Sequence, residues 1–384
     1  MYKDIFKKID ELFPEYVKVW EDICNIESPT NYKEGVDAVC EYFVKMSEKL
    51  GWDVEILHQE VAGNAACITI NPEVDAPQFC LSGHMDTVHP VGSFGYPPVR
   101  IEGDLMHGPG TVDCKGGCVS SFLAMDALFK CGYKNRPVKL ILQSDEETGS
   151  KTSGKKTVEF MCEKAKGAVA FINGESCDVK KKWTVALSRK GILRYRFNIT
   201  GKAVHSASCY DGANAIAEAA HKILELERMK DKDGLTCNCG VIEGGTVANT
   251  VAEKCSFLAD IRFATMAQMQ EAEREVMRIA NICYVEGCSC NVEKVSDRPP
   301  MEKSEKNVAL LEKINSIMAE CGYEPIKSEM RNGGSDAAYI TAIGVPCIDN
   351  LGILGNSIHS INECAVISSL AEAAKIMAAT IAAS

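Results

Sequence analysis

Two periodicities of apolar residues alternate along the chain. In residues 33–50 the apolar side chains recur at helical spacing, which predicts an amphipathic helix that ends at Gly51. Helical patterns also cover residues 116–130 and 155–166. Short apolar runs typical of buried strands lie around them, at residues 66–70, 78–82, 138–143 and 168–172. This alternation favours βα units around a mainly parallel sheet.

The pattern changes near Trp183. Residues 193–199 alternate with period two, which suits a sheet with one solvated face. Further elements complete a small α+β unit: helices over residues 213–229 and 266–284, and strands over residues 236–242, 254–263 and 289–295. The alternation of strands and helices then resumes, with a helix over 307–321, a strand over 345–348 and a helix from residue 367.

The length of 384 residues exceeds the size at which one core usually keeps growing, so we expect two domains. The simplest division places residues 1–184 and 299–384 in a first domain, with residues 185–298 inserted as a second. The predicted fold class is therefore α/β, with a mainly parallel sheet and an inserted α+β domain.

Composition and charge exclude several classes of partner. A hydrophobic content of 46% with 25% charged residues is typical of a globular protein. The formal net charge of −11 disfavours nucleic acid, which needs a clustered basic face. The N-terminus lacks the apolar core of a signal peptide, and no stretch approaches the ~18 apolar residues of a membrane span. We expect a cytoplasmic protein with no nucleic-acid or membrane partner.

Nineteen cysteines, an odd number at irregular spacing, favour reduced thiols in a reducing compartment. Two C-x-C pairs, Cys237 with Cys239 and Cys288 with Cys290, are alternative candidates for a structural zinc site. Their spacing favours packed thiols, because structural zinc sites usually separate paired cysteines by two to four residues.

A set of imidazoles and carboxylates carries the candidate chemistry. Its members are His84, Asp86, Asp113, Glu146, Glu147, Glu175 and His359. All except the last follow apolar runs, where a parallel sheet presents its functional loops. Because a zinc centre that activates water needs imidazole and carboxylate ligands and a nearby base, the set predicts a two-zinc hydrolase centre.

The spacing within this set supports particular roles. His84 and Asp86 point the same way on an extended segment, so the carboxylate can orient the imidazole. At a loop apex, one of Glu146 and Glu147 can bind metal while the other stands over the water and moves its proton. Asp113 lies in a glycine-rich turn that can bury a carboxylate between two cations. Taken singly, an acidic pair also fits a solvated turn, and one histidine a surface position.

The order H-x-D, D-x-K-G-G, E-E, E and a C-terminal H resembles the M20 zinc metallopeptidases, over essentially the whole chain. That family includes glutamate carboxypeptidases, aminoacylases, succinyl-diaminopimelate desuccinylases and dipeptidases. The resemblance implies a catalytic domain with an inserted lid and dimerisation domain, and a homodimer formed through that domain. It also implies two Zn²⁺ per subunit, with Co²⁺ or Mn²⁺ as substitutes.

The resemblance also implies site residues. The metal ligands would be His84, Asp113, Glu147, Glu175 and His359. Asp113 would bridge the two ions, with His84 and Glu175 completing one site and Glu147 and His359 the other. Glu146 would be the general base and acid, and Asp86 would support His84.

In the inserted domain, His205 matches a histidine that in relatives reaches the partner's active site and stabilises the oxyanion. Asn249 and Arg262 match substrate-holding positions, and an arginine suits a carboxylate bidentately. A substrate-facing loop is matched by Gly333, Gly334 and Ser335.

The chain departs from the family pattern at Pro109 and Cys114, where relatives often carry Arg and Met or Asp. We expect the Cys114 thiol to be packed and to point away from the metal ligands. His89 and His107 match no metal position, and we interpret them as supporting or surface residues.

The predicted activity is hydrolysis of an amide bond next to a free carboxylate, as in carboxypeptidases or dipeptidases. A metal-bridging hydroxide, formed when Glu146 takes a proton from water, would attack a small peptide or an N-acyl amino acid. An N-acyl-amino-acid deacylase or desuccinylase would share every metal residue and remains the alternative. A non-catalytic scaffold of the same fold is a remote alternative, which the complete ligand set argues against.

Overall fold

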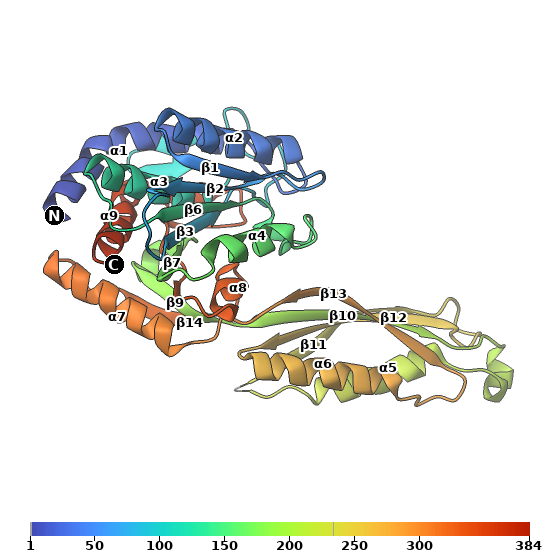
Figure 1. Cartoon of the computed structure of the whole chain (residues 1–384). Coiled ribbons are helices and arrows are strands. Elements are labelled where there is room, and N and C mark those ends of the chain that lie inside the picture. The colour runs from blue at the N-terminus through green and yellow to red at the C-terminus, as the bar shows by residue number, and fades with distance from the viewer. Residues whose placement is uncertain (1, 233) are drawn as a thin grey trace. The chain divides into compact units, whose positions relative to one another are not determined.

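The computed structural model describes residues 2–232 and 234–384, which form two compact units (Figure 1). Unit 1 comprises the described residues up to Leu187, with Lys303–Met330 and Ser335–Ser384. Unit 2 comprises the described part of Ser188–Glu302, with Arg331–Gly334. The domain limits expected at residues 184 and 298 lie a few residues from these unit limits and stay a prediction.

A six-stranded sheet forms the centre of unit 1. Its strands, in spatial order, are β1 (Asp53–Leu57), β2 (Ala65–Ile70), β6 (Val138–Gln143), β3 (Phe79–His84), β7 (Ala170–Asn173) and β15 (Cys347–Ile348). The last four run parallel, and β1 and β2 join antiparallel at one edge. The predicted α/β class with a mainly parallel sheet is therefore confirmed.

Seven of the described α-helices belong to unit 1: α1 (Tyr2–Asn25), α2 (Lys33–Lys49), α3 (Lys115–Lys130), α4 (Lys156–Ala165), α7 (Glu305–Glu320), α8 (Ala337–Ala342) and α9 (Ser369–Ala382). The connection through α3 leads from β3 to β6, and that through α4 leads back from β6 past β3 to β7. Because such crossovers are right-handed, opposite directions put α3 and α4 on opposite faces of the sheet.

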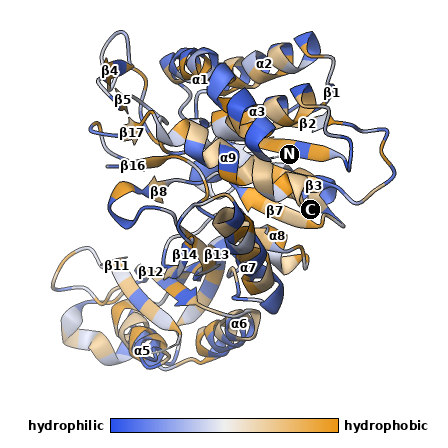
Figure 2. Cartoon of the chain, turned by 90° about the vertical axis from the view of Figure 1, so that its left-hand side faces the viewer, coloured by the Kyte–Doolittle hydropathy of each residue, from blue (hydrophilic) through white to orange (hydrophobic). Residues whose placement is uncertain are grey.

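Helix α3 is buried from Lys115 to Leu128, and most of its residues in this range are apolar or small. It packs against α1 and α9. Figure 2 shows many hydrophobic residues along the strands of the sheet and along α9. The buried Lys115 ammonium donates to the carbonyl oxygens of Ile23 at 3.3 Å and Ile26 at 2.7 Å, where α1 ends. This contact ties the start of α3 to the end of α1.

A second sheet of unit 1 was not expected from the sequence. It orders β4 (Arg100–Glu102), β5 (Leu105–His107), β17 (Cys364–Val366), β16 (Leu354–Asn356) and β8 (Cys177–Asp178). Strand β17 pairs antiparallel with β5 and with β16, so the three lie side by side (Figure 2). Strands of two or three residues are too short to show a period in the sequence. A further two-stranded ribbon pairs β14 (Lys327–Arg331) with β9 (Thr184–Arg189).

Unit 2 is an antiparallel sheet with two helices. The strands are ordered β11 (Thr236–Gly244), β12 (Lys254–Phe263), β10 (Gly191–Thr200) and β13 (Ser289–Arg298), and the helices are α5 (Ala215–Glu227) and α6 (Met266–Asn281). Alternate residues of β10 are buried, as the period-two pattern predicts. The rings of Phe197 and Phe257 stack at 4.6 Å between centroids in this core.

The prediction that the second helix of unit 2 reaches residue 284 is wrong, because α6 ends at Asn281. The buried Lys222 ammonium donates to the carbonyl oxygens of Ile279, Ala280 and Ile282, which satisfies the end of the helix. The Glu218 carboxylate accepts the backbone N–H groups of residues 284 and 285 and draws them out of the helix. Within the described residues, no helix combines the length and apolar character needed to cross a membrane.

Candidate metal centre

The predicted ligands of unit 1 gather at one edge of the six-stranded sheet. His84 ends β3, Glu146 and Glu147 follow β6 in a short 3₁₀ turn, and Glu175 follows β7. These three strands are parallel neighbours, so their carboxyl ends meet at the same edge. Asp113 lies there too, just before α3.

Asp113 lies between two histidines. Its Oδ1 is 3.1 Å from Nε2 of His84, and its Oδ2 is 3.1 Å from Nε2 of His359. On the first side, Nε2 of His84 is 3.7 Å from Oε1 of Glu175. On the second, Nε2 of His359 is 3.3 Å from Oε2 of Glu147. The structure therefore brings together all five predicted metal ligands, in two groups that share one carboxylate.

Glycines allow this close assembly. A Cβ atom at Gly117 would lie 1.8 Å from the carbonyl oxygen of Gly174, and one at Gly352 would lie 2.0 Å from it. The first turn of α3 therefore packs directly against the turn that carries Glu175. A side chain at either position would displace the turn that carries Glu175.

His359 lies on the loop of the β16–β17 hairpin. Its φ is 60° and that of Ser357 is 57°, both in the left-handed region. That region costs a non-glycine residue about 1–2 kcal/mol, and such strain is concentrated at functional sites. The hairpin and the contacts of the imidazole hold this conformation.

Asp86 has two positioning roles. Its carboxylate oxygens accept the backbone N–H groups of Glu146 and Glu147, both at 3.2 Å, and the hydroxyl of Thr30 at 2.6 Å. Nδ1 of His84 lies 2.9 Å from the main-chain oxygen of Asp86 and 3.3 Å from its Oδ1. The sequence predicted the support of His84, whereas the hold on the acidic turn is visible only in the structure.

Burial and mutual contact shift the pKa values of the five predicted ligands. Burial alone would raise the pKa of Asp113, but its hydrogen bonds with His359 and His84 lower it. Hydrogen bonds with Asp113 and Glu147 raise the pKa of His359 to about 10, and although burial opposes the change, the carboxylates raise the pKa of His84 well above its ordinary value. Burial raises the pKa of Glu147 to about 7 and that of Glu175 well above its usual range.

The donor set fits divalent cations. Ligand atoms of His84, Asp113 and Glu147 lie within 4.8 Å of one another, so the two groups that share Asp113 are close enough to hold neighbouring cations. Imidazole nitrogens and carboxylate oxygens are ligands for Zn²⁺, and nitrogen and oxygen sites also accept Co²⁺ and Mn²⁺. Three carboxylates around two histidines form an acid-rich site, which two divalent cations would neutralise.

The expectation that Cys114 points away from the ligands is wrong. Its Sγ lies within 4.8 Å of ligand atoms of His84 and Glu175, because α3 starts against the turn at Gly174. The thiol is buried and donates to the Gly174 carbonyl oxygen at 3.2 Å. A hydrogen bond with Cys118 and then burial raise the pKa of the Cys114 thiol well above its ordinary value. The expectation of a packed thiol agrees with these contacts.

Sequence reasoning missed Glu363. This residue is fully buried, and its Oε2 lies 2.8 Å from Nε2 of His89, which is buried too. His89 is therefore a supporting residue rather than a surface one. The only signal in the sequence was an acidic residue four positions after His359, directly before a short apolar run.

The predicted substrate residues of the inserted domain lie in unit 2. His205 forms an isolated bridge with Thr250, and the N–H of Ser206 donates to the carbonyl oxygen of Asn249 at 2.9 Å, so His205 and Asn249 lie on adjacent segments. Arg262 donates to both carboxylate oxygens of Asp260, from Nε at 2.6 Å and Nη2 at 3.1 Å. These contacts fix the direction of its guanidinium group.

The predicted glycine-rich loop divides between the units. Gly333 and Gly334 belong to unit 2, where their carbonyl oxygens accept from Nη1 of Arg189 at 2.9 and 3.4 Å. Ser335 belongs to unit 1, where its hydroxyl accepts from Nδ2 of Asn173 at 3.1 Å.

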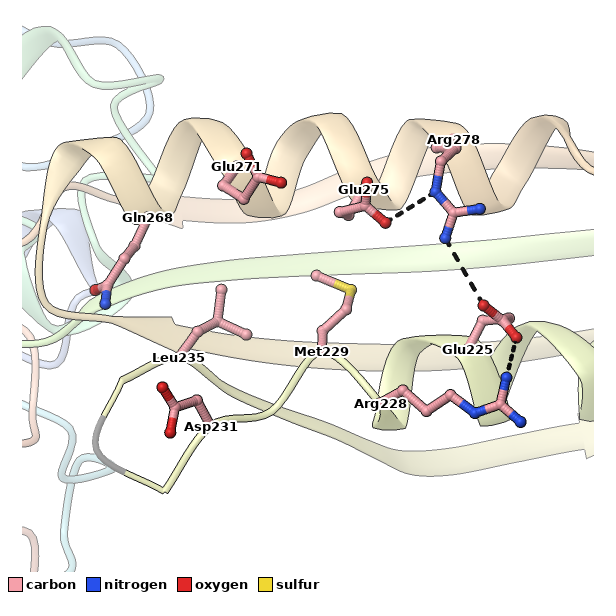
Figure 3. Close-up of a pocket in the computed structure, with 9 residues that line it drawn as sticks. All are labelled: Glu225, Arg228, Met229, Asp231, Leu235, Gln268, Glu271, Glu275 and Arg278. Atoms are coloured by element: carbon pink, nitrogen blue, oxygen red, sulfur yellow. Dashed lines mark hydrogen bonds and ion pairs between the residues drawn. The ribbon is translucent and has the colours of Figure 1, made fainter.

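Unit 2 has a pocket of its own, about 390 Å³ in volume, between α5 and α6 (Figure 3). Its charged side chains pair with one another, Glu225 with Arg228 and Glu275 with Arg278. It contains none of the predicted site residues, so we place the candidate centre in unit 1. In the described part of the chain, neither C-x-C pair belongs to a group of three metal-ligating side chains.

The chain is similar to known proteins over most of its length. The model of peptidase family M20/M25/M40 matches residues 80–383. Carboxypeptidase G2 from Pseudomonas sp. (strain RS-16) is 28% identical over 362 residues, which cover 93% of this chain and 86% of that protein. A succinyl-diaminopimelate desuccinylase from Shewanella pealeana is 24% identical over 368 residues, covering 91% and 92% respectively.

Two solved structures show the same fold. Aminopeptidase PepT from Bacillus cereus superposes with a TM-score of 0.76 at 22% identity, over 96% of this chain and 97% of that one. The YXEP protein from Bacillus subtilis, described as a dinuclear metal-binding peptidase, superposes with a TM-score of 0.67 at 15% identity, over 97% and 98%.

Proposed function

The chain belongs to peptidase family M20/M25/M40, and we propose that it hydrolyses an amide bond next to a free carboxylate in a small peptide, as carboxypeptidases and dipeptidases do. The family makes the chain a hydrolase of the metallopeptidase class. One observation carries the proposed site: the two oxygens of Asp113 face different histidines, His84 and His359, each at 3.1 Å.

Two metal ions, Zn²⁺ with Co²⁺ or Mn²⁺ as substitutes, would be held around this carboxylate. His84, Asp113 and Glu175 would hold one ion, and Asp113, Glu147 and His359 the other. When bound, such ions polarise the scissile carbonyl group and lower the pKa of water. The structural relative described as a dinuclear metal-binding peptidase supports this proposal.

The chain's own proton carrier would be Glu146. Its charge acts on buried Glu175, and its backbone N–H is held by Asp86, so the carboxylate is kept at the ligand group. A carboxylate there can accept a proton from the attacking water and give it to the leaving amine. Asp86 keeps Glu146 and Glu147 in fixed relation, so that one residue binds metal while its neighbour moves protons.

Unit 2 supplies candidates for the substrate. Asp260 contacts both Arg262 and Arg194, so the three side chains carry one net positive charge. We propose that Arg262 binds the substrate carboxylate, because a guanidinium group suits it bidentately. His205, Asn249 and the loop of Gly333, Gly334 and Ser335 remain candidates for the oxyanion and the substrate backbone.

A second activity has a specific observation in its favour. The desuccinylase relative matches nearly the full length of both chains. An N-acyl-amino-acid deacylase or desuccinylase would use the same metal ligands and would differ only in the residues that contact the acyl group. A scaffold without catalysis has less support, because all five ligands and Glu146 are present.

We also propose a homodimer formed through unit 2. Strand β11 is an edge strand, and such edges pair readily with another chain. Several apolar side chains on β11, on α5 and on the loop after β11 are exposed: Ile216, Leu224, Val241, Ile242 and Val247. Exposed apolar side chains beside an unpaired strand edge favour an interface there.

The test of the proposed activity compares zinc-reconstituted protein with a chelated control. Each is incubated with a pooled library of dipeptides and N-acyl amino acids, and the products are identified by mass spectrometry. We expect chelator-sensitive release of a C-terminal amino acid and about two metal ions per chain. Cleavage of N-acyl amino acids alone would favour the second activity. If nothing is cleaved although two ions are bound, the proposed reaction is wrong.

A further inference from the structure

Glu363 is a buried acid with several partners on one loop. It has no exposed surface, and its Oε1 accepts the backbone N–H groups of Val112 at 2.8 Å and Asp113 at 3.0 Å. Its Oε2 accepts the N–H of Gly110 at 3.3 Å and lies 2.8 Å from Nε2 of His89. One side chain therefore gathers three backbone donors from the segment that ends at Asp113.

The backbone of Glu363 makes two further links. Its carbonyl oxygen accepts the N–H of Gly108 at 3.4 Å, and its N–H donates to the carbonyl oxygen of Ser360 at 2.9 Å. Ser360 directly follows His359. Glu363 thus joins the segment that leads to Asp113 with the loop that carries His359.

The five-stranded sheet explains why these segments meet. His107, the last residue of β5, lies opposite Cys364, the first residue of β17. Because the pairing is antiparallel, the loop that leaves β5 towards Asp113 runs beside the loop that enters β17 from His359. Glu363 lies at that crossing.

The buried carboxylate of Glu363 depends on hydrogen bonds in place of water. A carboxylate buried away from water is costly unless hydrogen bonds replace its hydration. Hydrogen bonds to a charged acceptor are stronger than neutral ones, so the three N–H groups are held firmly in direction. The loop can converge on the carboxylate because Gly110 has φ 73°, a conformation that favours glycine.

We infer that Glu363 is the positioning residue of the proposed metal centre, setting the direction of Asp113 and its distance from His359. The inference rests on the proposed function. Glu363 is not itself a ligand of that centre. Its effect passes through the backbone N–H of Asp113, which it accepts directly, and through the hairpin loop, which it anchors.

Unit 2 offers a matched control. Glu218 is also buried, accepts the backbone N–H groups of Tyr284 and Val285 at 2.8 and 2.7 Å, and lies 3.0 Å from the ammonium of Lys222. It resembles Glu363 in burial and in backbone partners but belongs to the unit without the predicted metal ligands. Glu218→Gln therefore reports what loss of a buried carboxylate does to folding alone.

The experiment compares wild type, Glu363→Gln, Glu363→Asp and Glu218→Gln after removal of metal with a chelator. Thermal unfolding measures the stability of each stripped protein. Competition with a coloured chelator measures Co²⁺ affinity, and the visible spectrum of the Co²⁺ form reports the geometry of its ligands. Neither Co²⁺ measurement requires a substrate.

We expect Glu363→Gln to bind at least one Co²⁺ roughly 10–100-fold more weakly, with a changed spectrum, as for other residues that orient metal ligands. Glu363→Asp keeps the charge but is one methylene shorter, so its Co²⁺ affinity should lie between those of the wild type and Glu363→Gln. Glu218→Gln should lower the unfolding temperature while keeping the wild-type Co²⁺ affinity and spectrum.

Wild-type Co²⁺ affinity and spectrum in Glu363→Gln would overturn the inference. So would an equal loss of affinity in Glu218→Gln, because reduced stability would then explain both. If Glu363→Gln does not fold, Glu363→Asp decides, and wild-type affinity in that variant overturns the inference. A wild-type chain that binds two Co²⁺ but cleaves nothing contradicts the proposed function and leaves this comparison intact.

Discussion

The two units bury acidic side chains in different ways. In unit 2, Glu218 pairs with Lys222 one helical turn away, and the same lysine satisfies the end of α6. In unit 1, acids from distant parts of the chain meet at the sheet edge, where Asp113 contacts His84 and His359. The first arrangement neutralises itself locally, and the second needs protons or cations from outside.

This difference separates a structural use of buried charge from a functional one. A buried pair with complete hydrogen bonds disturbs its surroundings little, whereas breaking one by removing a partner is costly. Like charges gathered in one place destabilise the fold and remain only where another need keeps them. Unit 2 should therefore respond to changes through stability, and the edge of unit 1 through metal binding and turnover.

The largest expected effect is that of Glu146→Gln. Turnover of the best library substrate should fall roughly 10²–10⁴-fold, because a positioned acid–base group contributes that much. Metal content should stay near two per chain, and thermal stability should not fall, because one charge leaves an acid-rich site. Glu41→Gln, at an exposed position on α2, is the matched control. Wild-type turnover in Glu146→Gln would remove Glu146 from the mechanism.

Phe257→Ala should lower the stability of unit 2 and leave the metal affinity unchanged. The ring is buried and stacked on Phe197, so its removal should cost about 3–5 kcal/mol of unfolding free energy. Denaturant unfolding measures this loss, and Co²⁺ titration under native conditions should give the wild-type affinity. A parallel loss of metal affinity would contradict the separation of the two units.

The metal affinity of the chelator-stripped protein should rise with pH. His359 has a pKa of about 10 and Glu147 one of about 7, so both are protonated below these values. Metal binds their unprotonated forms and must therefore displace these protons. For each proton displaced, the metal affinity should rise roughly tenfold per pH unit at pH values below the pKa of that group. Below about pH 7 both protons contribute, and between about pH 7 and 10 that of His359 does.

Calorimetry of Zn²⁺ binding in buffers of different ionisation enthalpy would count the released protons. We expect at least one proton per chain at pH 8. Binding without proton release, and with the same affinity at pH 6 and 8, would show that these contacts do not describe the stripped protein.

The smallest expected effect concerns the proposed dimer. Ile242 on β11 is half exposed, so Ile242→Lys should weaken dimerisation about tenfold while the folded unit is kept. Sedimentation over a concentration series measures the equilibrium, and Lys254→Ala, at an exposed position on the neighbouring strand β12, serves as the control. An unchanged equilibrium would place the interface elsewhere, and a monomeric wild type would exclude the dimer.

Much of this architecture follows from local patterns in the sequence. The apolar runs predicted the central strands β2, β3, β6 and β7, because strands buried on both faces read as continuous apolar segments. The polar residues at their ends predicted His84, Glu147 and Glu175 as neighbours, because parallel strands share an edge. The period-two pattern predicted β10 of unit 2 for the same local reason.

Other features depend on contacts between distant residues. Strands β5, β16 and β17 have three residues each and pair only with strands distant in the sequence or across a loop, so they are too short to show a periodicity. The end of α6 depends on Lys222 and Glu218, which belong to another helix. The nearness of Cys114 to the ligands depends on the contact between α3 and the turn at Gly174.

The sequence by itself determined which residue types stand at the ends of which strands, and with them the family and the five proposed ligand positions. Only the tertiary structure decided which oxygen of Asp113 faces which histidine, and that Glu363 holds both loops. The physical reason is the separation of the interacting residues along the sequence. Periodicity reflects the burial of neighbouring residues, whereas the direction of the Asp113 carboxylate depends on residues from distant parts of the chain, such as His359.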